Sequence, residues 1–192
     1  MPDSETRQRI IMAAIQLLGQ KGFADMSMND IVSVSGISKG GVYWHFKSKD
    51  EIIQAIFDFF FDAQLELINA TLESDGTAAE KLERIFRLAS AEAVDNFPPP
   101  MEFYALATRS EGLKRGMSDY FEAYRQRVAD LLQQGIEDGE FEMSDPAMVS
   151  VNIISLLEGI VLIGLLVPHT WGFQAQVNNA VDLILRGLSK RR

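Results

Sequence analysis

The sequence predicts an all-α protein with a small N-terminal helix-turn-helix domain and a larger helical domain after it. Apolar residues recur at helical spacing in every segment, and no segment shows the sustained alternation typical of a β-strand. Capping residues precede these segments, and glycine or proline follows them. We place the domain boundary at the beginning of the long helix that starts near Ser48, with residues 1–48 as the first domain and residues 49–192 as the second.

Three helices are expected in the first domain. The first runs from about Ser4 to Gln20 and stops at Gly22, because helices commonly end in a left-handed residue. Ser27 is expected to cap a second, short helix that ends near Ser35. The inward face of this second helix is predicted to consist of Ile31, Val32 and Val34.

The turn Gly36-Ile37-Ser38 separates the second helix from a third, which covers residues 39–45 and is capped by Ser38. Two short helices around a tight glycine turn form the motif that places its second helix in the major groove of DNA. Gly40 and Gly41 each cost this helix about 1 kcal/mol relative to alanine. Bare backbone at this point would allow a close approach to phosphates.

Side chains suited to DNA gather on the third helix and just after it. Cations and aromatic hydrogen-bonding residues fall together here, a combination suited to phosphates and base edges. The pattern alone leaves open the alternative that the aromatic residues are hydrophobic anchors and the lysines a solvated face. The set consists of Lys39, Tyr43, Trp44, His45, Lys47 and Lys49.

This region resembles the signature of the TetR (tetracycline-repressor-like) family. The stretch IVSVSGISKGGVYWHFKSKDEI, residues 31–52, matches it nearly position by position, with Trp44 as the one departure noted. The resemblance covers about residues 5–55 and implies that Ser27, Met28, Ser38 and Lys49 mainly position the backbone. It implies direct DNA contacts by Lys39, Gly40, Tyr43, Trp44 and His45.

Val42 and Phe46 are assigned to the small core of the first domain. They fall on the side of the third helix opposite Tyr43 and Trp44, because side chains of a helix repeat every 3.6 residues.

Six further helices are expected in the second domain. Two capping boxes are predicted, one formed by Ser48 and Glu51 and one by Thr77 and Glu80. In a capping box, each of the two side chains accepts a hydrogen bond from the backbone amide of the other residue. Asp145 and Pro146 form a start signal for a later helix. The expected ranges are about 48–73, 77–96, 101–109, 113–138, 146–167 and 173–189.

The segment from Pro146 to Val167 has the length and apolar character of a membrane span. Glu158, Asn152 and several small residues interrupt it, and no basic anchors flank it. We therefore favour a helix at a subunit interface, and expect the last two helices to form a homodimer with their copies. Since the N-terminus lacks an apolar signal core, we expect a cytoplasmic protein without membrane association.

The resemblance also implies a small-molecule effector site among the helices between about residues 82 and 166. Pockets combine aromatic residues, methionine and a few polar groups. Glu158 is the most informative candidate, because burying a carboxylate in an apolar helix is costly unless it is paired or matched to a cationic ligand. The alternatives are an exposed rim position for Glu158 and simple core roles for the others. The candidates are Phe97, Met101, Phe103, Tyr104, Ala107, Tyr120, Tyr124, Asn152, Glu158 and Trp171.

Charge is distributed unevenly along the chain. The net charge is −9, yet residues 1–50 carry six Lys/Arg against five Asp/Glu. What DNA senses is the local face within a Debye length of about 8–10 Å. The acidic total therefore does not exclude DNA as a partner.

The chain has no cysteine, and its histidines are His45 and His169 alone, so we expect no metal site. No nucleophile with a base and no glycine-rich phosphate loop stands out, so we expect neither a cofactor nor an enzyme. The predicted function is a dimeric, ligand-responsive transcriptional regulator, most simply a repressor, that binds double-stranded palindromic operator DNA. The alternatives are an enzyme and a helical binding module that does not bind DNA.

Overall fold

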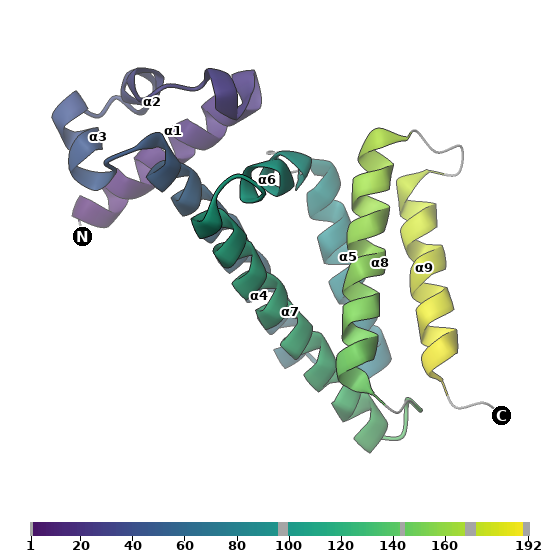
Figure 1. Cartoon of the computed structure of the whole chain (residues 1–192). Helices are drawn as coiled ribbons and strands as arrows, with labels where there is room; N and C mark the ends of the chain where they lie inside the picture. Colours follow the sequence, from purple (N-terminus) through teal and green to yellow (C-terminus); the bar gives the residue numbers. More distant parts are fainter. Residues whose placement is uncertain (1, 96–99, 143–144, 168–171, 190–192) are drawn as a thin grey trace. The chain divides into compact units, whose positions relative to one another are not determined.

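The computed structural model describes residues 2–95, 100–142, 145–167 and 172–189, and these residues form nine α-helices and no β-strand (Figure 1). The predicted all-α class is confirmed. The helices are α1 (Pro2–Asp25), α2 (Met28–Ser35), α3 (Lys39–His45), α4 (Lys49–Glu73), α5 (Ala78–Asp95), α6 (Pro100–Ala107), α7 (Glu111–Glu137), α8 (Pro146–Leu166) and α9 (Phe173–Leu188).

Local start and stop signals set the first three helices. Gly22 adopts φ 74° and ψ 172° and interrupts α1 where the sequence predicts its end. The Ser27 hydroxyl accepts a hydrogen bond from the Asp30 amide, and the Asp30 carboxylate accepts one from the Ser27 amide. Gly36 ends α2 with φ 66°, and the Ser38 hydroxyl caps α3 by accepting from the Gly41 amide at 3.1 Å. The predicted helix-turn-helix is confirmed.

Two local predictions are wrong. Val34, expected to face inward, is 40% exposed, whereas Ser35 beside it is buried and its hydroxyl accepts a hydrogen bond from the Ile37 amide. At the start of α4, the Ser48 hydroxyl accepts from the Glu51 amide as predicted. The Glu51 carboxylate, however, accepts from the Lys47 amide, one residue earlier than a regular capping box requires. The box at Thr77 and Glu80 forms as predicted.

The helices fall into two compact units. Unit 1 comprises residues 1–62 and 97–117, and unit 2 comprises residues 63–96 and 118–192. The helix α4 therefore contributes its first half to unit 1 and its second half to unit 2. The boundary predicted at residue 48, at the start of α4, stays a prediction.

The core of unit 1 joins the first three helices to the start of α4 and to segments much later in the chain. Val42 and Phe46 are buried in it, as predicted. Gly112 and Gly116 of α7 lie against the side chain of Gln54, and a Cβ atom on Gly116 would lie 3.0 Å from the Gln54 amide nitrogen. The later segments contribute Phe103, Leu106, Ala107 and Leu113 to this core.

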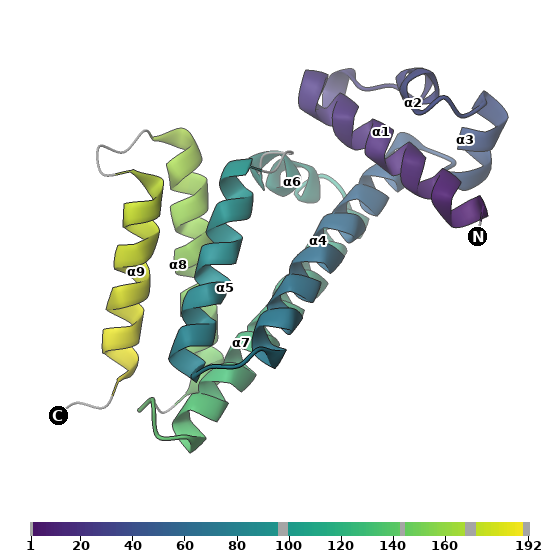
Figure 2. The same cartoon turned by 180° about the vertical axis from the view of Figure 1, so that it is seen from behind.

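In unit 2, α5, α8 and α9 lie side by side, as both views show (Figures 1 and 2). Polar contacts fasten the ends of its helices. Lys81 is buried, and its ammonium donates to the Leu72 carbonyl at the end of α4. The Glu140 carboxylate accepts from the amides of Ala78 and Ala79 at the start of α5.

Among the described helices, α8 is long and apolar enough to cross a membrane. A third of its most apolar window is buried, through residues that pack within unit 2 such as Ile153 and Leu157. The Asp145 carboxylate caps its start by accepting from the Met148 amide at 3.0 Å. These are the features of a helix in a folded bundle that keeps one apolar face exposed.

Candidate functional site

The third helix separates a buried side from an exposed side. Val42 and Phe46 lie in the core of unit 1, while Tyr43 is 38% and Trp44 64% exposed. The Trp44 ring meets the His45 ring edge to face, with centroids 4.6 Å apart. The side chains predicted to contact DNA are thus held at the surface by the two residues predicted to be core.

The start of α3 is open to solvent. Ser38, Lys39 and Gly40 are exposed, and a Cβ atom on Gly40 would meet no atom within 4 Å. Gly41 differs, because its Cβ would lie 2.8 Å from the Ile37 side chain. The absence of a side chain is therefore required by the fold at Gly41 but not at Gly40.

Most cations of the first fifty residues are engaged within unit 1. Lys47 donates to the carbonyls of Tyr43 and Trp44 at 2.9 and 3.1 Å, at the end of α3. Lys49 donates to the Phe23 carbonyl at 2.9 Å and lies over the Phe23 ring. Arg7 lies over the Phe46 ring, Arg9 donates to the Ser35 carbonyl, and Lys21 pairs with Asp30. Among the Lys and Arg residues of positions 2–50, Lys39 alone makes no such contact.

The residues predicted to position the DNA backbone have roles in the fold. Ser27 and Ser38 cap helices, Lys49 joins the start of α4 to Phe23, and Met28 packs against the core of unit 1. The hydrogen bond from Lys21, together with those from Ser27, lowers the pKa of Asp30 to about 2. These contacts fix the position of the second and third helices.

A pocket of about 500 Å³ lies in unit 2 between α7 and α8. Each helix contributes four residues at the spacing i, i+3, i+4 and i+7, which places them along one face. We call this the α7/α8 pocket. It is lined by Ser118, Phe121, Glu122 and Arg125 of α7 and by Val151, Ile154, Ser155 and Glu158 of α8.

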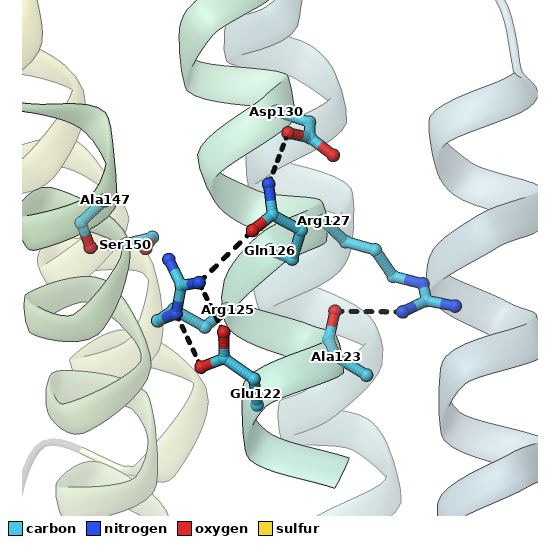
Figure 3. A network of polar contacts seen from close by, with 8 residues as sticks. All are labelled: Glu122, Ala123, Arg125, Gln126, Arg127, Asp130, Ala147 and Ser150. Atoms are coloured by element: carbon cyan, nitrogen blue, oxygen red, sulfur yellow. Dashed lines mark hydrogen bonds and ion pairs between the residues drawn. The ribbon is translucent and has the colours of Figure 1, made fainter. Parts of the chain in front are cut away.

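A chain of polar contacts runs along α7 (Figure 3). The Arg125 guanidinium binds the Glu122 carboxylate with two nitrogens, one at 2.7 Å, and this contact lowers the pKa of Glu122. Arg125 also donates to Gln126, which donates to Asp130 at 2.8 Å. Arg127 points to the other side of α7 and donates to Asn69 of α4 at 2.6 Å.

Two tyrosines of α7 lie near each other in unit 2. Tyr124 is buried, and its ring centroid lies 6.1 Å from that of Tyr120. Burial first, and then the charges of Tyr120 and Glu158, raise the pKa of Tyr124 well above its usual value. Tyr124 is thus within interaction range of two other predicted ligand-site residues, Tyr120 and Glu158.

The chain matches two protein-family models. Residues 10–56 match the model for bacterial regulatory proteins of the tetR family, and residues 100–188 match the C-terminal domain of BetI-type transcriptional repressors. The chain belongs to the TetR family of transcriptional regulators. The resemblance seen in residues 31–52 is thereby confirmed, and the later match extends it over most of the second half of the chain.

Individual proteins agree with this assignment. The chain is 28% identical over 156 residues to the uncharacterised regulator YfiR of Bacillus subtilis, covering 79% of this chain and 76% of YfiR. Its fold is similar to that of a regulator from Saccharomonospora viridis solved with choline, with a TM-score of 0.84, 20% identity and coverage of 98% and 100% of the two chains. It is also similar to SmeT in its complex with triclosan, with a TM-score of 0.80, 21% identity and coverage of 97% and 92%.

The other predicted ligand residues of this TetR-family chain are not gathered at the α7/α8 pocket. Phe103 and Ala107 are buried in unit 1, where the Phe103 ring lies 4.2 Å from that of Phe57. Tyr104 belongs to the same unit, and Asn152 is exposed on α8 without lining the pocket. Phe97, Trp171 and the side chain of Met101 lie outside the described residues.

Seven of the eight pocket residues were missed by the sequence analysis, which identified Glu158 alone. The available signal was the spacing i, i+3, i+4 and i+7 on both helices. This spacing identifies pocket residues only once it is known which helix each face packs against. Among the described residues, no group of His, Asp or Glu side chains is arranged to hold a metal ion.

Proposed function

We propose that this TetR-family regulator is a repressor that binds operator DNA through α3 of unit 1 and releases it when a small molecule enters unit 2. The observation that carries the proposal is the exposed face of α3, where Tyr43 and Trp44 stand beside Lys39 on a helix capped at its start. The match to a BetI-type repressor domain supports repression. In this proposal the protein acts in the cytoplasm by binding, without a catalytic step.

Direct DNA contacts are assigned to Lys39, Gly40, Tyr43, Trp44 and His45. Lysine and the polar ends of aromatic side chains suit phosphates and base edges. Since Lys47 and Lys49 already bind carbonyl groups of unit 1, Lys39 is the best-placed cation for a phosphate contact. Ser27, Met28, Ser38 and Lys49 support these residues by holding the two helices in place.

A homodimer through α8 and α9 is part of the proposal. These helices leave large apolar side chains exposed, and a second copy would cover them. Two helix-turn-helix units about 34–36 Å apart then match successive turns of a palindromic operator. The exposed residues assigned to this interface are Met148, Leu156 and Ile163 of α8 and Leu183 of α9.

Small-molecule control is supported by the α7/α8 pocket. Its volume of about 500 Å³ lies within the usual range for ligand sites, about 300–1,000 Å³. The similar folds solved with choline and with triclosan show that regulators of this architecture take up small molecules.

The test of DNA binding compares variants of the full chain on the DNA upstream of its own gene, at two salt concentrations. The wild type is expected to bind tightly and to weaken steeply with salt, because phosphate contacts release counterions. Tyr43→Ala and Lys39→Ala are expected to lose most of this affinity. Lys114→Ala removes an exposed lysine outside α3 and is the matched control. Absence of binding by the wild type would leave a helical ligand-binding protein and overturn the proposal.

The dimer is tested separately by sedimentation equilibrium. Leu156→Asp places a charge on the exposed face of α8 and is expected to shift the wild-type dimer to monomers. Met12→Asp makes the same change at an exposed apolar residue of α1 and is expected to leave the dimer intact. A monomeric wild type, or equal behaviour of the two variants, would contradict the assigned interface.

A further inference from the structure

Unit 1 has a groove that the proposed contacts with DNA and with the second subunit do not use. It lies between α1 and the end of α2 and has a volume of about 550 Å³. Met12 is 49% exposed and Val34 is 40% exposed, and both line this groove. We call it the α1/α2 groove. Its lining also includes Glu5, Gln8 and Arg9 of α1.

The groove carries opposite charges that do not pair with each other. Glu5 and Arg9 lie one turn apart on α1, and within the described part of the chain no ion pair joins them. The Arg9 guanidinium donates from one nitrogen to the Ser35 carbonyl at 3.0 Å, which holds it beside the end of α2. A groove with one carboxylate, one guanidinium and exposed apolar side chains is complementary to a second copy of itself.

A contact between two identical surfaces forms each of its residue pairs twice, once in each direction. Two antiparallel copies of α1 would bring Glu5 of each chain beside Arg9 of the other and place Gln8 near its own copy. Met12 and Val34 of each chain would then be covered by apolar surface of the other. Such a contact satisfies the charges and the apolar side chains of the groove together.

We propose that the α1/α2 groove joins neighbouring dimers on DNA, with the same groove of a second copy as its occupant. The inference rests on the proposed function, because it needs a dimer that binds operator DNA. The groove ends just before the turn at Gly36, which leads into α3, so it belongs to the unit that DNA would hold in place. DNA with two sites raises the effective concentration of the two surfaces. A contact too weak to join free dimers would therefore still produce cooperative binding.

The experiment compares the full-length protein on DNA with one site and on DNA with two sites. The site is the segment upstream of the protein's own gene that the wild type protects from nuclease cleavage. In the two-site fragments, the distance between the sites is varied over two helical turns of about 10.5 base pairs each. At one helical phase the wild type is expected to bind the second site about tenfold more tightly than the first, a usual size for coupling between sites. Half a turn away this gain is expected to vanish.

Two charge variants separate the groove from the rest of α1. Met12→Asp places a negative charge in the groove and is expected to abolish the gain at the second site. Gln20→Asp adds the same charge at an exposed position of α1 outside the groove and is expected to keep the gain. Both variants are expected to bind one-site DNA equally and to remain dimers in free solution.

A disulfide test locates the contact, because the chain has no cysteine of its own. Gln8→Cys is expected to form disulfides between chains under mild oxidation on two-site DNA and not on one-site DNA. Gln20→Cys makes the same change outside the groove and is expected to form none on either fragment.

The absence of cooperativity at every spacing would overturn the inference, and so would equal cooperativity in Met12→Asp and Gln20→Asp. Disulfides of Gln8→Cys that form equally on one-site DNA would overturn it as well, since they would place the contact within one dimer. In each of these cases salt-sensitive binding to one-site DNA leaves the proposed repressor function standing. A wild type that does not bind the upstream DNA would refute the proposed function and this inference together.

Discussion

In unit 1, the residues proposed to contact DNA come from one helix of seven residues, α3. The pocket in unit 2, in contrast, is lined by residues of two helices that lie far apart in the sequence. The α3 face is held by caps and by two buried side chains of the same short segment. The pocket exists only through the packing of α7 against α8. The α3 face therefore depends on local signals in the sequence, whereas the α7/α8 pocket depends on the packing of the whole of unit 2.

The two regions also use charge differently. Around α3, cations such as Lys47 and Lys49 bind carbonyl groups and so stabilise the surface that carries Tyr43 and Trp44. In the α7/α8 pocket, Arg125 binds Glu122, and Glu158 is a second carboxylate of the lining. In unit 1 these charged side chains stabilise the fold around α3, whereas in unit 2 Glu122, Arg125 and Glu158 line a pocket.

The dependence of unit 2 on distant packing is tested most strongly at Gly135. A Cβ atom here would lie inside contact distance of the Phe141 ring and 3.0 Å from the Ala78 Cβ. Gly135→Ala is expected to lower the free energy of unfolding by about 1–3 kcal/mol, since overpacking displaces neighbours. The change in the free energy of unfolding is measured by urea denaturation. Gly187→Ala, where nothing lies within 4 Å, is the control and is expected to be neutral or slightly stabilising.

Gly40→Ala separates function from stability in α3. A Cβ atom at Gly40 meets open space, so alanine is expected to raise the free energy of unfolding by up to about 1 kcal/mol. If DNA lies against this backbone, the same methyl group lowers DNA affinity, by about tenfold for a cost of about 1.4 kcal/mol. Thermal unfolding and gel shifts measure the two effects. A stabilised variant with wild-type DNA affinity would remove Gly40 from the interface.

Arg127 tests the bond between α7 and α4 within unit 2. Arg127→Met removes the hydrogen bond to Asn69 and keeps an apolar side chain, at an expected cost of about 1 kcal/mol in unfolding free energy. Arg87→Met disrupts an exposed pair with Glu83 on α5 and is expected to cost less than about 0.5 kcal/mol. Equal costs in urea denaturation would show that the bond to Asn69 adds nothing beyond a surface pair.

The smallest effect is expected at Asp30, which has a pKa of about 2 in the folded protein against a usual 3.8. A lowered pKa means that the ionised carboxylate stabilises the fold above about pH 4 and loses this contribution as the pH falls toward 2. The difference in melting temperature between wild type and Asp30→Asn should therefore shrink over that interval. Asp25→Asn is the matched control at the end of α1. A difference that stays constant with pH would contradict the assignment.

Much of unit 1 was predictable because its signals are local. Ser27, Ser38 and Gly36 act within a few residues of their own positions, so the pattern predicts both the helices and the turn. Val34 shows where prediction from local signals fails. It lies near the end of a short helix, where one residue of difference in register exchanges an inward position for an outward one, and Ser35 is buried in its place.

The pocket was predictable only in part. Glu158 is conspicuous in the sequence because it is charged within an apolar helix, but nothing in α7 alone says that Phe121 and Arg125 face it. Phe103 looked equally suitable for a ligand site, yet its ring packs against Phe57 in unit 1. Which aromatic residues line a pocket and which fill a core is decided by tertiary contacts.

The later residues in the core of unit 1 have a consequence for how the protein is made. Phe57 is buried beside Phe103, and Leu113 belongs to the same cluster. Synthesis adds about 5–20 residues per second, and domains generally fold as units as they emerge. Phe57 therefore leaves the ribosome before Phe103, the ring it packs against, has been made. The core of unit 1 is completed only after residues 103–113 have been made. A ribosome that stalls between residues 57 and 103 therefore carries a helix-turn-helix whose core still lacks these later side chains.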